Sequence, residues 1–91
     1  MLDWDEGNWP KCAKHGLTKT EIEFVLSNTP LVLRDKNTNL SESRFNAVGA
    51  TTEGRYLFIV FTFRTVAGLR LMRPISARYM HTKEIERYEQ R

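Results

Sequence analysis

Arginine is the dominant cation in the second half of the chain. Between Arg44 and Arg78 every basic residue is an arginine, and Glu53 is the only acidic residue there. A planar guanidinium grips phosphate or carboxylate through paired hydrogen bonds and stays charged at physiological pH. This choice of cation favours anion recognition, although ion pairs between neighbouring strands would use the same residues. The six are Arg44, Arg55, Arg64, Arg70, Arg73 and Arg78.

The acidic residues and the single cysteine argue against a metal site. Residues 1–43 carry five basic and seven acidic side chains, whereas residues 44–91 carry nine and four. The carboxylates are dispersed, and no tight cluster of the kind that holds a divalent cation is present. Cys12 has neither a disulfide partner nor the further ligands of a zinc site. We therefore expect no metal or other cofactor, and a reducing compartment.

Length and composition indicate one small globular domain over residues 1–91. The chain has 91 residues, of which 41% are hydrophobic and 27% charged, so it can bury one modest core. No apolar run approaches the roughly 20 residues that span a bilayer. The first residues are acidic, unlike a signal peptide. We expect a cytoplasmic protein with no membrane partner.

The elements that position these residues begin with two short helices. The sequence predicts a helix over residues 5–14 that stops at Gly16, after a short strand at residues 1–4. Thr18 and Glu21 have the spacing of a capping box and open a second helix, which ends at residues 28–30.

The second half is typical of an antiparallel sheet. Strands are predicted at residues 31–33, 44–50, 56–64 and 69–78, with a loop at residues 34–43, and a charged helix at residues 82–90 closes the chain. Pro74 indicates an edge strand or a bulge. This order predicts an α+β fold, with helices packed on one antiparallel sheet.

Strand alternation predicts where two of the arginines lie. Leu57, Ile59, Phe61 and Phe63 share one face, and Thr62 and Arg64 emerge together from the other. Phe58 and Val60 make the second face apolar too, so we expect this strand to be covered on both sides or to lie deep in the sheet. Arg64 and Arg78 lie near ends of neighbouring strands, but alternation does not say whether those ends meet.

Short motifs follow one another in order along nearly the whole chain. They are Trp4-Asp5, Asn8, Lys14-His15-Gly16, Thr18, Glu42-Ser43-Arg44, Val48-Gly49, Gly54-Arg55, Val60-Phe61-Thr62, Arg64, Ile75-Ser76-Ala77-Arg78, Glu84 and Tyr88-Glu89. None is specific alone. The ordered set resembles the BrnT family, toxins of a bacterial type II toxin–antitoxin system.

The resemblance implies a fold, an activity and partners. The fold would be RelE-like, with two N-terminal helices and a C-terminal helix packed on a mainly antiparallel sheet. The activity would be metal-independent endoribonuclease cleavage of free RNA or ribosome-associated mRNA, which inhibits translation. The partner would be a BrnA-like ribbon-helix-helix antitoxin that neutralises the toxin, and operator DNA would be reached only through it.

The resemblance also implies a site. RNA cleavage without a metal needs groups that accept and donate protons, and cations that stabilise the charged transition state. The matched motifs supply the expected catalytic residues Lys14, His15, Arg64 and Arg78. The expected substrate-binding residues are Arg44, Arg55, Glu84 and Tyr88.

Each assignment has a structural alternative. Lys14 and His15 lie near the end of a helix, where cations offset the helix dipole. Arg64 and Arg78 would also pair with the glutamates of the C-terminal helix. At the level of the whole protein, the alternatives are a catalytically inactive toxin fold that binds the antitoxin, and a small basic nucleic-acid-binding domain.

Overall fold

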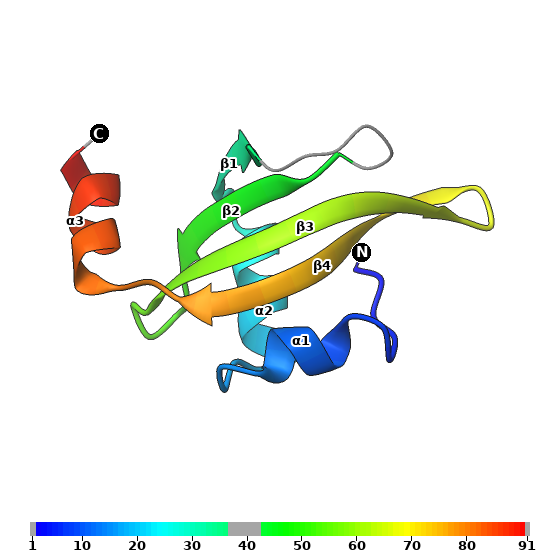
Figure 1. Cartoon of the computed structure of the whole chain (residues 1–91), viewed down its shortest axis with the longest axis horizontal. Coiled ribbons are helices and arrows are strands. Elements are labelled where there is room, and N and C mark those ends of the chain that lie inside the picture. Colours follow the sequence, from blue (N-terminus) through cyan, green and yellow to red (C-terminus); the bar gives the residue numbers. More distant parts are fainter. Residues whose placement is uncertain (1, 37–42, 91) are drawn as a thin grey trace.

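The computed structural model describes residues 2–36 and 43–90. The helices and strands are α1 (Trp9–Ala13), α2 (Lys19–Ser27), β1 (Leu31–Arg34), β2 (Phe45–Ala50), β3 (Tyr56–Val66), β4 (Leu69–Tyr79) and α3 (Thr82–Gln90). The four strands form one antiparallel sheet in the order β1-β2-β3-β4 (Figure 1). The predicted α+β class is confirmed. Most of the predicted loop at residues 34–43 lies outside the described residues.

The core lies between α1, α2 and one face of the sheet. Leu57, Ile59 and Phe61 alternate along β3 and are buried on the one face that alternation predicted they would share. They pack with residues of the two N-terminal helices and of the turn between them, namely Cys12, Leu17, Ile22, Val25 and Leu26. We call this side of the sheet the inner face and the opposite side the outer face. By alternation, Phe58 and Val60 lie on the outer face and are only half-buried.

Local signals account for α2 and for its close approach to the sheet. The predicted capping box is present: the Glu21 backbone N–H donates to Thr18 Oγ1 at 3.1 Å, and the Thr18 N–H donates to Glu21 Oε1 at 2.9 Å. A Cβ added to Gly49 on β2 would lie 3.0 Å from the side chain of Val25. Glycine therefore allows α2 to pack tightly on the sheet.

The first helix is shorter than predicted because Asn8 bonds elsewhere. Its side chain does not cap α1. Instead Asn8 Oδ1 accepts from the Asp5 N–H, and Nδ2 donates to the carbonyl oxygens of Asp3 and Pro74, each at 2.8 Å. These bonds hold the preceding residues in a turn. The predicted strand at residues 1–4 is reduced in the described part to a single bridge between Leu2 and Met72.

Pro74 has both features that the sequence predicted for it. β4 is an edge strand, and its register shifts where Val60 pairs with Ser76 but Phe61 pairs with Pro74. Ile75 is therefore the extra residue of a bulge. Proline has no N–H to donate, so it is tolerated at this position.

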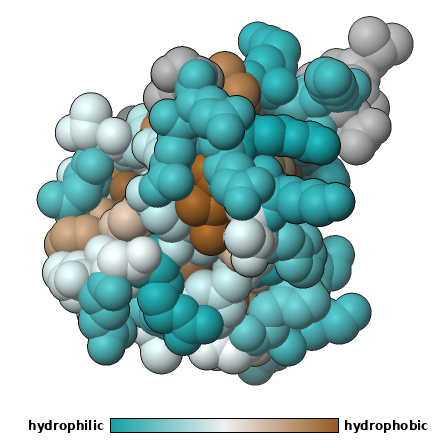
Figure 2. All heavy atoms as spheres, turned by 90° about the vertical axis from the view of Figure 1, so that its left-hand side faces the viewer, coloured by the Kyte–Doolittle hydropathy of each residue, from teal (hydrophilic) through white to brown (hydrophobic). Residues whose placement is uncertain are grey.

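The third helix lies at one end of the sheet and the β3–β4 hairpin projects at the other (Figure 1). The bounds predicted for α3 are confirmed. β3 continues to Val66, two residues beyond its predicted end. Seen from the α3 end, the surface is mainly hydrophilic, with hydrophobic atoms visible between polar side chains near the middle (Figure 2). No helix in the described ranges has the length and apolar character needed to cross a membrane.

Candidate active site

A pocket of about 480 Å³ lies between the C-terminal end of α1 and the outer face of β3 and β4. Its walls are cationic and its floor is largely apolar. The lining residues are Lys11, Lys14, His15, Phe58, Val60, Ser76, Ala77 and Arg78. Three of the four predicted catalytic residues, Lys14, His15 and Arg78, are thus brought to one pocket.

Helix geometry places the cations from α1. Lys11 and Lys14 are three residues apart, so they lie on the same side of the helix. Lys14 is the C-cap residue, and Gly16 at a φ of 85° ends the helical turn as predicted. The side chains of Lys11, Lys14 and His15 are exposed and form no ion pair within the described residues. They are free to meet an anionic ligand.

Arg78 forms an ion pair with a glutamate of the C-terminal helix, as the structural alternative in the sequence analysis predicted. Its two terminal nitrogens donate to the two carboxylate oxygens of Glu84 at 2.7 and 2.8 Å. The guanidinium also lies over the ring of Phe58, 4.7 Å from its centroid. The pKa of Glu84 is lowered to about 2. The largest cause is the hydrogen bond from Arg78, and the next is the hydrogen bond from the His81 N–H. A phosphate that approaches Arg78 must therefore share it with Glu84 or displace Glu84.

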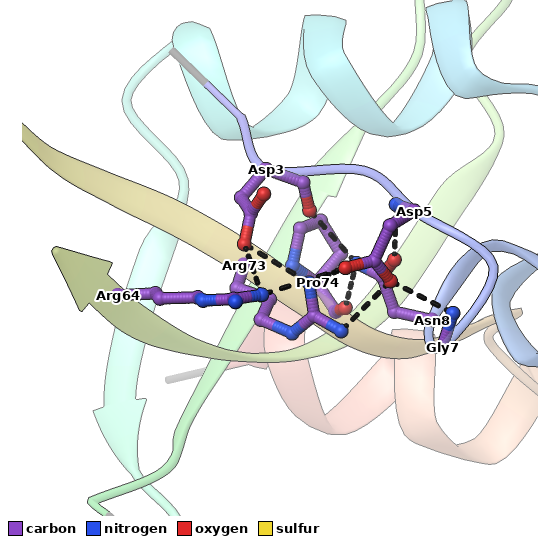
Figure 3. A network of polar contacts seen from close by, with 7 residues as sticks. All are labelled: Asp3, Asp5, Gly7, Asn8, Arg64, Arg73 and Pro74. Atoms are coloured by element: carbon purple, nitrogen blue, oxygen red, sulfur yellow. Dashed lines mark hydrogen bonds and ion pairs between the residues drawn. The ribbon is translucent and has the colours of Figure 1, made fainter. Parts of the chain in front are cut away.

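Arg64 lies far from this pocket along the sheet. Because β3 and β4 are antiparallel, Arg64 pairs with Leu71, whereas Arg78 pairs with Phe58 near the other end. Arg64 instead joins a cluster with Asp3, Asp5 and Arg73 (Figure 3).

The cluster clamps the N-terminal segment to β4. Arg73 contacts Asp3 at 2.9 Å and Asp5 at 3.0 Å, and the contacts of Arg64 are longer, at 3.3 and 3.4 Å. The pKa of Asp5 is lowered to about 2. The largest cause is the hydrogen bond from Arg73, and the next is the hydrogen bond from the Gly7 N–H. Arg73 was among the arginines noted in the sequence, but its role depends on residues about seventy positions away.

The predicted substrate-binding residues are dispersed. Arg55 stacks on the ring of Tyr79 at 3.6 Å, and Tyr88 packs edge-on against Tyr56 at 5.5 Å. Arg44 is half-buried just before β2 and is already engaged in an interaction. Only Glu84 reaches the pocket, through Arg78. The structure does not bring these four residues together.

Sequence reasoning missed five of the pocket residues, namely Lys11, Phe58, Val60, Ser76 and Ala77. A signal existed for Lys11 in its three-residue spacing from Lys14. Strand alternation grouped Phe58 and Val60 on one face, but only the tertiary structure shows that this face is opposite the core and which part of it α1 borders.

Cys12 does not line the pocket, and the acidic residues of the described ranges offer no metal site. Cys12 is buried, and burial raises the pKa of its thiol to about 11, so the reactive thiolate is disfavoured. Residues 2–36 and 43–90 contain no group of three or more His, Cys, Asp or Glu side chains placed to hold a metal ion.

The Arg78–Glu84 pair makes stability depend on acid pH. The pKa of Glu84 is lowered from 4.5 to about 2, so the pair stabilises the fold fully above pH 4.5 and loses this effect as pH falls toward 2. We expect Glu84→Gln to lower the melting temperature at pH 7, and the difference from the parent to vanish near pH 2. Thermal melts across this range measure it. A difference that stays constant with pH would contradict the assignment.

Comparison with known proteins identifies the family. No curated protein sequence matches the chain. A protein-family model described as the ribonuclease toxin BrnT of type II toxin–antitoxin systems matches residues 4–84. The match spans both walls of the pocket, from the N-terminal segment to Glu84. It also implies an antitoxin as partner. The chain therefore belongs to the BrnT family of type II toxin–antitoxin ribonuclease toxins.

Proposed function

We propose that the chain is an endoribonuclease that cuts RNA in the pocket between α1 and the outer face of the sheet, without a bound metal ion. The observation that carries this proposal is the convergence of Lys11, Lys14 and His15 on one pocket. These exposed side chains, two of them lysines, face an apolar floor, and a nucleotide offers both the charge and the flat apolar base to match.

The proposed reaction uses the RNA's own 2′-hydroxyl. Its oxygen attacks the adjacent phosphorus, and the bond from phosphorus to the 5′-oxygen breaks. The products are a 2′,3′-cyclic phosphate and a 5′-hydroxyl. The 2′-hydroxyl loses a proton and the departing 5′-oxygen gains one. His15 suits one of these transfers because histidine exchanges protons near neutral pH. Lys11 and Lys14 stabilise the negative charge that builds up on the phosphate oxygens.

Arg78 enters the proposal as a side chain shared between Glu84 and the substrate. We expect Arg78→Ala to lower cleavage at least tenfold, because it removes a cation and uncovers Phe58. Initial rates with purified protein measure the effect, and Arg87→Ala on α3 is the matched control. Parental activity at an unchanged melting temperature would remove Arg78 from the site. Arg64, Arg44, Arg55 and Tyr88 are not part of the proposed site, because they lie elsewhere.

The partners follow from the same proposal. The chain acts in the cytoplasm as one RelE-like toxin domain and inhibits translation by cutting mRNA. A BrnA-like ribbon-helix-helix antitoxin neutralises it and carries the pair to operator DNA. The helices α1 and α2 packed on one face of an antiparallel sheet support the RelE-like assignment.

The test is incubation of purified, antitoxin-free chain with end-labelled RNA in EDTA, alone and with translating ribosomes. Fragments ending in a 2′,3′-cyclic phosphate support the proposal, and the ribosome arm shows whether free RNA suffices. Cleavage that requires added Mg²⁺ would overturn the metal-free mechanism. RNA that stays intact in both arms would favour an inactive toxin fold that only binds its antitoxin.

A further inference from the structure

The β3–β4 hairpin projects beyond the body of the protein as an arm (Figure 1). We define the arm as residues 63–72, from the pair Phe63–Met72 to the pair Val66–Leu69. Ala67 and Gly68 close it in a two-residue turn, with φ of 51° and 81°. Such a tight turn fixes the register of the two strands. The arm is therefore a defined ribbon that presents its side chains at fixed positions.

Large apolar side chains on the arm are exposed. Phe63 is 37%, Val66 40% and Leu69 63% exposed, and among the described residues only Val32 and Leu33 join them as large exposed hydrophobics. A two-stranded ribbon buries little surface of its own, so packing within the arm does not account for its apolar residues. Apolar residues gathered on a projecting element mark a surface that a partner covers.

The charge of the arm selects the class of partner. No acidic residue occurs from Arg55 through Lys83. Arg64 and Arg70 lie on the arm. Arg64 is shared with Asp3 and Asp5 at its base, whereas the guanidinium of Arg70 stacks on Phe63 at 3.9 Å. Two copies of such an arm would repel each other. A nucleic acid would match the charge but would leave Val66 and Leu69 without apolar contacts. A protein segment that combines acidic and apolar side chains matches both properties.

Within residues 2–36 and 43–90, the outer edge of the β4 backbone is unpaired toward the tip. The Asp3 N–H donates to the Met72 carbonyl at 2.8 Å, and Leu2 bridges Met72. Beyond Met72, at Leu69–Leu71, no described residue pairs with this edge. An open edge accepts an added strand through main-chain hydrogen bonds, while alternating side chains provide specificity.

We propose that the arm is a docking site for the antitoxin, which adds an extended acidic and apolar segment along the β4 edge at Leu69–Leu71. The partner follows from family membership and does not depend on the cleavage chemistry. Val66 and Arg64 lie on the same face of β3 as Val60 of the pocket, by alternation. An antitoxin segment held on this face is thus directed along the sheet toward the pocket, which would couple binding to neutralisation.

The test measures binding of the purified cognate antitoxin to the full chain by calorimetry. The arm variant carries Val66→Asp with Leu69→Asp. The matched control carries Val32→Asp with Leu33→Asp on β1, where the two residues are 44% and 58% exposed. We expect the arm variant to raise the Kd at least 100-fold, and the β1 variant to stay within threefold of the parent. RNA cleavage by the arm variant should be unchanged.

Several results would overturn the inference. One is an arm variant that binds the antitoxin as tightly as the parent. Another is loss of RNA binding with the antitoxin affinity retained, which would make the arm a nucleic-acid surface. A third is a parent dimer that only the arm variant dissociates. If the double aspartate variant does not fold, Leu69→Ser alone should raise the Kd at least tenfold. Because antitoxin binding is measured directly, the change in Kd can be interpreted even if the parent protein cuts no RNA.

Discussion

Replacing His15 with alanine should lower RNA cleavage by about 10²- to 10⁴-fold, the usual effect of losing a positioned general acid or base. His15 lines the pocket together with Lys11 and Lys14, and its side chain is exposed. The substitution therefore removes a proton-transfer group without opening the core. The melting temperature should stay within about 4 °C of the parent, because surface substitutions usually change stability by less than about 0.5 kcal/mol.

The chain contains its own control for this experiment. His81 is the second of its two histidines, and it is exposed at the start of α3 and does not line the pocket. His81→Ala should keep the parental rate. The pH–rate profile adds an independent test, since a limb that depends on His15 should disappear in His15→Ala. Equal rates for the two variants, or a profile of unchanged shape, would exclude His15 from proton transfer.

Asn8→Ala should produce the largest loss of stability among polar substitutions, about 3 kcal/mol. Asn8 is only 3% exposed, and its side chain bonds the Asp5 N–H and the Asp3 and Pro74 carbonyls. Alanine leaves the bulged part of β4 and the N-terminal turn without these partners. A loss of this size lowers the melting temperature of a domain of this length by about 12–24 °C.

The control for this prediction is Asn28→Ala. Asn28 is exposed, and its side chain donates one bond, to the Phe24 carbonyl at the end of α2. Water can replace that bond, so we expect a loss below about 1 kcal/mol. Urea denaturation of both variants beside the parent measures the two free energies of unfolding. Similar losses for Asn8→Ala and Asn28→Ala would show that Asn8 does not hold the N-terminal turn to β4.

Interactions between residues close in sequence explain why much of the fold was predictable. The capping box at Thr18 and Glu21 joins residues three apart, and it begins α2 where expected. Alternation along β3 requires only a regular strand, and it grouped Leu57, Ile59 and Phe61 on one face; the packing of α1 and α2 made that face the core. Proline without an N–H predicted an irregular edge strand at Pro74. The N-terminal boundary of α1 was predicted wrongly, because the bonds of Asn8 reach Pro74, sixty-six residues away.

The sequence by itself determined the α+β class, most element boundaries and, through the ordered motifs, the family. The tertiary structure decided which charged residues act together. Antiparallel pairing turns the chain back on itself, so Arg64 and Arg78 end at opposite ends of neighbouring strands. Arg64 then forms ion pairs with Asp3 and Asp5. Arg78 pairs with Glu84 and lines the same pocket as the lysines of α1. Spacing along a chain fixes the side of a helix or strand that a residue occupies, but only the register between strands and the packing of helices fix its neighbours.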